Sequence, residues 1–316
     1  MNTLTRRDAL QSLASLIPAV ALASTLHAAE PKPLWKTAIG LNGFLSSASK
    51  YKKSYPLWEI LDYASRAGFA GVEIVQLWPS PGDYYASTET DRIRALRRLY
   101  DGFGLQIFSI QLFTDHAFSP DPDIRKQWLA TFRDRIKFAR ALGCNCVGMW
   151  PGGALGNQTF DQALTHLASS YREAAKIAAD AGIIAAFEIE PPFIFNKEEH
   201  MQRILAEAQP SPLKIIYDPS HFDLMNGSTG KPHEMLARIG VKNLGYVQLT
   251  DSDGTLRDGG TSKHVPCGDG HANVPASLKL LRDNNFRGWI MIDAWETPDP
   301  CDASTKGLKA ITAASA

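Results

Sequence analysis

Two glutamates end a short apolar run of the sequence, IIAAFEIEPP at residues 183–192. Successive side chains of a β-strand point to opposite faces, so Glu188 and Glu190 share one face with the small Ala186, and the bulky Phe187 points the other way. Glutamate is uncommon inside strands and costs free energy when it is buried without a partner. The acidic face therefore predicts a metal ion, a base or a proton beside it.

Eight short apolar runs predict the strands that must position these residues, at 36–41, 71–76, 105–110, 146–150, 183–190, 214–218, 244–250 and 289–293. Segments with helical periodicity alternate with them, at 56–67, 89–103, 124–142, 160–181, 197–208, 232–239, 275–284 and 302–313. Strand and helix repeated eight times with right-handed crossovers predict an α/β fold, a single-domain (β/α)8 TIM barrel. A doubly wound open sheet is the alternative, but it usually has a glycine-rich phosphate turn after its first strand, and LNGF at 41–44 is not one.

The catalytic residues of such a barrel lie at the C-terminal ends of its strands. Carboxylate or amide side chains stand at the predicted ends of strands two and five to eight: Glu73, Glu188, Glu190, Asp218, Gln248 and Asp293. Because strands five to eight are consecutive around the barrel, these carboxylates would raise one another's pKa unless a cation lay among them. Oxygen ligands of this kind predict one divalent metal ion: Mn²⁺, Mg²⁺ or Co²⁺.

Several motifs resemble the sugar phosphate isomerases and epimerases that have a xylose-isomerase-like TIM barrel. These motifs are FAGVE at 69–73, AGI at 181–183 leading to Glu188, DPSH at 218–221, HVPCGDG at 264–270 and FRGW at 286–289 leading to Asp293. The resemblance covers most of the chain from residue 30 and is strongest in its second half. It implies that the metal ligands are Glu188, Asp218, Gln248 and Asp293, and that His221 contacts the substrate.

The chain departs from the family pattern at two of these positions. Gln248 stands where the family has a histidine, and Asp293 stands where it has a glutamate. A glutamine can ligate a metal through its carbonyl oxygen, but it lacks the affinity of an imidazole for softer ions. The departures leave open a metal site of reduced affinity or a site that has been lost.

The remaining candidates are predicted to bind the substrate: Glu73, Glu190, His116, Trp150 and His264. Each has a structural alternative, as a packed, ion-paired or solvated residue. Asp218 could instead cap a turn before Pro219, and Glu296 competes with Asp293 for the role of the last carboxylate.

The function that the resemblance implies is a metal-dependent isomerisation or epimerisation of a free sugar or keto-sugar through an enediolate. Glu188 and Asp293 would be the catalytic acid and base. The sequence has no glycine-rich phosphate cradle, which favours an unphosphorylated substrate. A lyase that acts on an oxidised (3-keto) glycoside and a non-catalytic carbohydrate-binding barrel are the alternatives. A DNA endonuclease is disfavoured because the charges balance, with 33 Lys plus Arg and 33 Asp plus Glu, so no nucleic-acid partner is expected.

The first 29 residues predict an export signal, which leaves residues 30–316 for the barrel. Paired arginines at positions 6 and 7, an apolar run at 13–23 and ALA at 21–23 resemble a twin-arginine signal, and an amphipathic leader or membrane anchor is the alternative. The expected location is the periplasm. The apolar run is too short to span a bilayer, so no stable membrane insertion is expected after cleavage. The sequence leaves the oligomeric state open, including a homo-oligomer.

Overall fold

The computed structural model describes residues 34–75, 89–113 and 115–315. The predicted export signal, residues 1–29, lies outside the described residues. Leu34–Ala316 forms one compact unit. Within the described ranges, none of the helices combines the length and apolar character that crossing a membrane requires.

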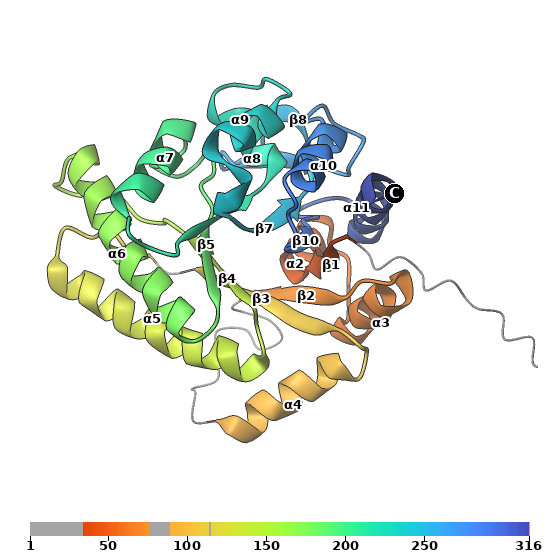
Figure 1. Cartoon of the computed structure of the whole chain (residues 1–316). Coiled ribbons are helices and arrows are strands. Elements are labelled where there is room, and N and C mark those ends of the chain that lie inside the picture. The colour runs from red at the N-terminus through yellow and green to blue at the C-terminus, as the bar shows by residue number, and fades with distance from the viewer. Residues whose placement is uncertain (1–33, 76–88, 114, 316) are drawn as a thin grey trace, which may run out of the picture. The chain divides into compact units, whose positions relative to one another are not determined.

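Eight parallel strands close into a barrel in the order β1-β10-β7-β6-β5-β4-β3-β2 (Figure 1). They are β1 (Lys36–Gly40), β2 (Gly71–Val75), β3 (Gln106–Phe113), β4 (Cys146–Trp150), β5 (Ile184–Phe187), β6 (Lys214–Tyr217), β7 (Leu244–Leu249) and β10 (Trp289–Ile292). Each of them overlaps one of the eight predicted strands. The predicted (β/α)8 barrel is confirmed.

The helices follow the strands along the chain and surround the barrel (Figure 1). They are α2 (Leu41–Tyr51), α3 (Leu57–Ala67), α4 (Thr90–Asp101), α5 (Pro122–Leu142), α6 (Phe160–Asp180), α7 (Glu198–Glu207), α8 (Pro219–Met225), α9 (Pro232–Ile239), α10 (Val274–Asp283) and α11 (Pro300–Ser315). A short 3-10 helix, η1 (Val241–Asn243), precedes β7. Eight of the α-helices were predicted within a few residues of their ends.

The sequence analysis missed α2, α8 and an antiparallel hairpin of β8 (Asp251–Leu256) and β9 (Ser262–Val265). Helix α2 contains a glycine, which weakens a helix by itself. Gly43 is nevertheless required there, because a Cβ atom would lie 2.9 Å from the backbone carbonyl carbon of Ala294. Long-range packing therefore places this helix against the end of β10.

The core has two parts, one between the strands and the helices and a smaller one inside the barrel. On the fifth strand, Ala185 and Phe187 belong to the outer part and Ala186 belongs to the inner part. The two faces predicted for this strand are therefore confirmed. Inside the barrel, the ring of Phe108 stacks on Trp289 at 4.6 Å between centroids and meets Tyr246 edge-on at 5.5 Å. Aromatic side chains fill the interior below the strand ends.

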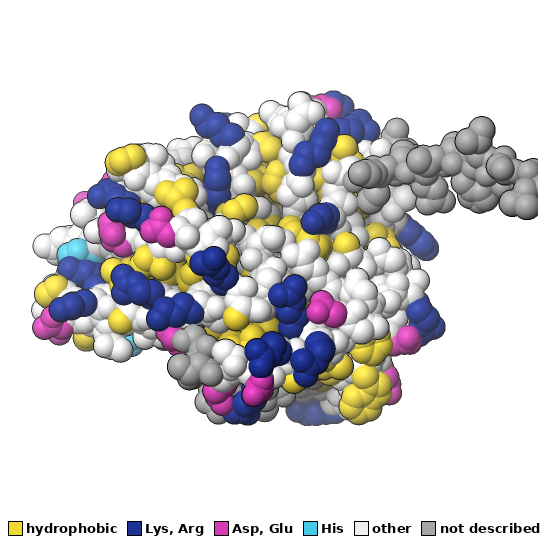
Figure 2. All heavy atoms as spheres, turned by 60° about the horizontal axis from the view of Figure 1, so that its bottom comes forward, with side chains coloured by type: hydrophobic (Ala, Val, Ile, Leu, Met, Phe, Trp, Pro, Cys, Tyr) yellow, Lys and Arg dark blue, Asp and Glu magenta, His cyan; other side chains and the backbone are white. Residues whose placement is uncertain are grey.

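Basic and acidic side chains are mixed on the outer surface, as their equal numbers in the sequence suggest. Figure 2 shows Lys and Arg side chains spread singly over one face, with Asp and Glu between them. Exposed ion pairs such as Arg66 with Asp62 and Arg203 with Glu207 lie on single helices, where each contributes little to stability.

Candidate metal centre and active site

A cavity of about 160 Å³ lies where the C-terminal ends of the strands converge. It is lined by Asn42, Gln111, Trp150, Glu188, Glu190, His221, Gln248, Thr261, His264, Asp293 and Trp295. Seven of these residues were predicted from the sequence as substrate or metal contacts: Trp150, Glu188, Glu190, His221, Gln248, His264 and Asp293. Residues on or just after seven of the barrel strands, together with two from the β8–β9 hairpin, thus meet around one small space.

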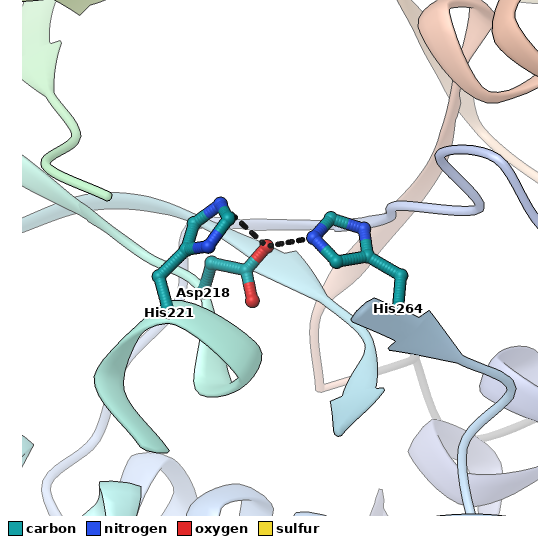
Figure 3. A group of neighbouring side chains, drawn as sticks. All are labelled: Asp218, His221 and His264. Atoms are coloured by element: carbon teal, nitrogen blue, oxygen red, sulfur yellow. Dashed lines mark ion pairs between the residues drawn. The ribbon is translucent and has the colours of Figure 1, made fainter. Parts of the chain in front are cut away.

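Asp218, His221 and His264 form the densest part of the site (Figure 3), with one ligand atom of each within 4.8 Å of the others. Asp218 directly follows β6 and caps α8, because its Oδ1 accepts a 2.7 Å hydrogen bond from the backbone nitrogen of Ser220. Pro219 begins this helix, and its first turn carries His221. Oδ2 of Asp218 lies 3.8 Å from Nε2 of each histidine. The capping role and the site role proposed for Asp218 are therefore compatible.

His264 reaches the carboxylates from the hairpin and not from the barrel wall. It stands on β9, and its Nδ1 lies 3.9 Å from Oδ1 of Asp293. The side chain is 4% exposed overall, yet neither ring nitrogen has a hydrogen-bond partner among the described residues. Burial, together with the nearby His221 and Arg257, holds the pKa of His264 well below its usual value. A neutral imidazole with free nitrogens is a metal ligand.

The other carboxylates of the centre are Glu188 and Asp293. Oε2 of Glu188 accepts a 2.7 Å hydrogen bond from the indole of Trp150, and Oε1 has no partner in the described part of the chain. Asp293 accepts from the backbone nitrogen of Trp295 at 2.9 Å, and the side chain of Asn42 lies at 3.4 Å. Glu188 is thus oriented by one neighbour and Asp293 by two, and each carboxylate can accept a further partner.

The buried carboxylates repel one another, and a cation among them would relieve this repulsion. Burial, with the negative charges of Asp218, Glu190 and Asp293, raises the pKa of Glu188 well above its usual value. Burial and the charges of Asp218 and Glu73 do the same to the pKa of Asp293, and burial raises the pKa of Asp218 to about 7. Three buried carboxyl groups and a neutral imidazole fit a divalent ion, and Glu188, Asp218 and His264 have unpartnered atoms among the described residues. The imidazole widens the choice toward Zn²⁺, Mn²⁺ or Co²⁺.

A second group of polar residues lies beside the centre. Nδ1 of His221 and the hydroxyl of Ser262 are 2.8 Å apart, and Nε2 of His221 lies 3.7 Å from Oε2 of Glu190. Thr261 donates a 2.6 Å hydrogen bond to the same glutamate oxygen. Glu190, whose role the sequence left open, therefore faces the cavity and is held by the hairpin.

Gln248 and Glu73 contact each other. Nε2 of Gln248 donates a 2.9 Å hydrogen bond to Oε1 of Glu73, and Nε2 of Gln111 donates to the same oxygen at 2.8 Å. Glu73 is fully buried and does not appear among the described residues that line the cavity.

Besides Glu73, two other predicted candidates lie apart from the cavity. His116 is exposed, with a φ of 84°, and is not one of the described residues that line the cavity. Glu296, the competitor of Asp293, pairs with Lys50 and with Arg257, whose Nη1 is 3.3 Å away. This leaves Asp293 as the eighth-strand carboxylate that faces the cavity.

The sequence analysis missed Asn42, Gln111, Thr261, Ser262 and Trp295. Asn42 and Trp295 closely follow predicted strands one and eight, and this position was a usable signal. The hairpin residues gave no such signal, because residues 251–265 read as a polar loop.

Comparison with known proteins places these observations in context. The model of a family described as "Xylose isomerase-like TIM barrel" matches residues 61–313. An inosose dehydratase of Clostridium botulinum is 23% identical over 277 residues, which cover 78% of this chain and 85% of that protein. A D-psicose 3-epimerase of Ruminiclostridium cellulolyticum is 23% identical over 222 residues, which cover 67% of this chain and 73% of that protein.

Solved structures agree on the fold. The IOLI protein with a bound zinc atom superposes with a TM-score of 0.69 at 16% identity, over 88% of this chain and 97% of that one. The 3-keto-D-glucoside 4-epimerase YcjR from E. coli gives a TM-score of 0.64 at 15% identity, over 88% of this chain and 99% of that one. At these identities the likeness shows the fold.

Proposed function

Because the chain belongs to the xylose isomerase-like TIM barrel family, we propose that it is an enzyme that transfers a proton next to the carbonyl group of an uncharged sugar, with the help of one divalent metal ion. The observation that carries this proposal is that Glu188, Asp293 and His264 line one small cavity, and that Oδ2 of Asp218 lies 3.8 Å from Nε2 of His264. Among the described residues, Oε1 of Glu188, Oδ2 of Asp218 and both ring nitrogens of His264 have no hydrogen-bond partner. A barrel that only bound sugar would have no need for three buried carboxyl groups, each of which costs folding free energy.

The residues that would hold the ion are Glu188 through Oε1, Asp218 through Oδ2, Asp293 and His264. When bound, the ion would act as a Lewis acid on a carbonyl oxygen and a neighbouring hydroxyl, and so acidify the C–H bond beside them. His221 would complete the centre from the first turn of α8, either beside the ion or on a substrate oxygen.

Glu188 and Asp293 are the proposed proton carriers. They follow β5 and β10, between which β6 and β7 lie in the barrel, so they reach the cavity from different directions. One carboxylate can therefore take a proton from one face of a carbon, and the other can return a proton to the opposite face. This arrangement suits epimerisation or aldose–ketose isomerisation through an enediolate.

The lining of the cavity suits an uncharged sugar. Within the described part of the chain, the lining residues include neither Lys nor Arg. Arg257, which lies near Trp295, already pairs with Glu296 and donates to two backbone carbonyls. A phosphate or carboxylate substrate normally meets such cations. Trp150 and Trp295 instead offer aromatic surface against which a sugar ring can pack.

A lyase is the second candidate, and the relatives favour it alongside the epimerase. Two kinds of dehydratase are among them: the inosose dehydratase and a probable 3-DHS dehydratase, AsbF from Bacillus anthracis, which superposes with a TM-score of 0.66. The first step would be the same proton abstraction. If the β carbon carries a glycosidic oxygen or a hydroxyl, the electron pair of the broken C–H bond forms a new C=C bond. The oxygen leaves with the electron pair of its C–O bond and takes up a proton, and an unsaturated carbonyl compound forms.

Solvent exchange separates these functions. The protein is incubated in D₂O with free ketoses and with 3-keto-glycosides, with Mn²⁺ and with EDTA, and the products are followed by NMR. Deuterium at one carbon without elimination supports the epimerase or isomerase, and an unsaturated product supports the lyase. Sugar binding without exchange of any substrate would support the binding barrel and overturn both enzymes.

We also propose, from the sequence of residues 1–29, that the protein is exported to the periplasm. Fusion of residues 1–29 to a reporter that is active only after twin-arginine export would test it. A variant with lysines in place of Arg6 and Arg7 is the matched control.

A further inference from the structure

We infer that Gln248 accepts a hydrogen bond from a substrate hydroxyl, and that Glu73 is a positioning residue that fixes the orientation of the Gln248 amide. The inference rests on the proposed function for the presence of a sugar in the cavity. It assigns to Gln248 a role different from that of the metal ligand suggested by the resemblance.

The orientation of Gln248 follows from its contact with Glu73. Oε1 of Glu73 receives two amide hydrogen bonds, from Nε2 of Gln248 at 2.9 Å and from Nε2 of Gln111 at 2.8 Å. Two donors occupy both lone-pair directions of this oxygen, so it acts only as an acceptor. A proton on the carboxyl group, which burial favours by raising the pKa of Glu73, would lie on Oε2. In either state the nitrogen of Gln248 points to Glu73.

The carbonyl oxygen of Gln248 must then point away from Glu73. Gln248 lines the cavity and Glu73 lies beneath it, so the free end of the amide is directed to the cavity. A carbonyl oxygen is a pure acceptor, and the groups of a sugar that can donate to it are hydroxyls. The site would therefore select a substrate that carries a hydroxyl at this point over one that carries a hydrogen or a keto oxygen there.

The arrangement is rigid because three strands hold it. Glu73 stands on β2, Gln111 on β3 and Gln248 on β7, and all three side chains are almost completely buried. The pairing of β2 with β3 shifts register between Val72 and Glu73, so that Glu73 pairs with Ser109 and Val75 pairs with Gln111. This irregularity of the ladder brings the Gln111 amide to the buried carboxyl group.

The metal centre does not depend on Gln248. Glu188, Asp218, Asp293 and His264 already provide three carboxylates and an imidazole. The imidazole that the family pattern places on the seventh strand is supplied here by the hairpin. The strand position is thereby available to the substrate.

The test separates binding of the metal from binding of the sugar, and it needs no turnover. Mn²⁺ alone is titrated by calorimetry, and D-tagatose, D-psicose and their monodeoxy derivatives are titrated into the Mn²⁺-loaded protein by tryptophan fluorescence. The variants are Gln248→Met, Glu73→Leu and the conservative Glu73→Gln, with Gln127→Met on the exposed surface of α5 as the matched control.

We expect Gln248→Met to weaken sugar binding about tenfold and to leave the affinity for Mn²⁺ unchanged, because one hydrogen bond to the sugar is lost. One monodeoxy sugar should bind to the wild-type protein about tenfold more weakly than its parent sugar does. Gln248→Met should bind that deoxy sugar with the same affinity as the wild-type protein. Glu73→Leu should resemble Gln248→Met, whereas Glu73→Gln, whose amide oxygen can still accept from Gln248, should bind nearly as well as wild type.

A loss of Mn²⁺ affinity in Gln248→Met would make Gln248 a ligand and overturn the inference. Equal binding of every sugar by Gln248→Met and wild type would overturn it as well, as would a wild-type protein that binds none of them. If Glu73→Leu does not fold, the affinities of Gln248→Met and of the wild-type protein for the deoxy sugars still decide whether the inference holds. Failure of the exchange assay with intact sugar binding would contradict the proposed reaction and leave this inference standing.

Discussion

The indole nitrogen of Trp150 donates a 2.7 Å hydrogen bond to Oε2 of Glu188, and Oε1 of the same carboxylate lies 3.9 Å from Nε2 of His221. Trp150→Phe keeps an aromatic ring in the cavity and removes the donor. Since partners of metal ligands typically contribute 10- to 100-fold to affinity, we expect the Kd for Mn²⁺ to rise about tenfold in calorimetric titration. Trp58→Phe, at a tryptophan that is 63% exposed on α3, is the control. An unchanged Kd in Trp150→Phe would show that Glu188 is oriented without the indole.

His264→Ala tests the imidazole of the hairpin. Its two nitrogens lie 3.8 Å from Asp218 and 3.9 Å from Asp293, and the described residues offer them no hydrogen bond. We expect the affinity for Mn²⁺ or Zn²⁺ to fall more than about 100-fold, which exceeds the effect of losing a residue that only hydrogen-bonds to a ligand. His166→Ala, at a histidine of α6 that bonds to Gln158, should bind metal as wild type does. Retention of metal by His264→Ala would remove His264 from the ligand set.

Metal binding should release protons and strengthen as the pH rises. Burial raises the pKa of Asp218 to about 7, so this carboxyl group is largely protonated at pH 6, and a metal ion must displace the proton. His264, whose pKa burial depresses, is already neutral there and contributes no proton. We expect the apparent Kd for Mn²⁺ to fall about tenfold between about pH 6 and about pH 8. Calorimetry at pH 6.5 in two buffers of different ionisation enthalpy measures the release, and a count of zero protons would contradict this assignment.

Asp293→Asn should separate proton transfer from folding. The amide has the same size as the carboxylate, and its oxygen can still accept from the backbone nitrogen of Trp295. It cannot, however, take a proton from the substrate or return one to it. We expect kcat for solvent exchange to fall on the order of 10²- to 10⁴-fold. Asp283→Asn on the surface of α10 is the control. Full exchange activity in Asp293→Asn would place the second proton carrier elsewhere.

Substitutions at two positions of the fifth strand are expected to lower stability by different amounts. Phe187 is fully buried between β5 and the helices, and Phe187→Ala should lower the free energy of unfolding by about 3–5 kcal/mol. Ile184, at the start of the strand, is 40% exposed, and Ile184→Ala should cost no more than about 1 kcal/mol. Urea denaturation of the two variants measures both values. Equal destabilisation would contradict the packing of this strand.

The barrel could be predicted because its signals are local. Each strand is an apolar run, and the helices end where glycines such as Gly68 and Gly143 adopt a left-handed conformation at their C-caps. The strand that bears Glu188 was predicted to extend to residue 190. Its regular ladder ends at Phe187, yet the alternation of faces continues, since Glu188 and Glu190 both line the cavity.

The site was harder to predict because part of it depends on contacts between distant residues. Arg257, which directly follows β8, pairs with Glu296 beyond β10 and donates to the backbone oxygen of His264, and these contacts hold the hairpin against the barrel mouth. A sequence rich in Asp, Gly, Ser and Thr has no local pattern that reveals such an anchor. The contact between Gln248 and Glu73 joins strands that are far apart in the sequence, so position alone assigned these two residues to separate roles.

The barrel and the β8–β9 hairpin have different parts in the molecule: the barrel forms the hydrophobic core, and the hairpin adds side chains to the candidate site. The barrel wall buries its core without the hairpin, whereas His264, Ser262 and Thr261 all stand on it. We therefore expect that replacing the hairpin with a different sequence would change the preferred ion or the reaction and leave the barrel intact. Among chains with this barrel, the segment after the seventh strand is the place where we expect new specificities to arise.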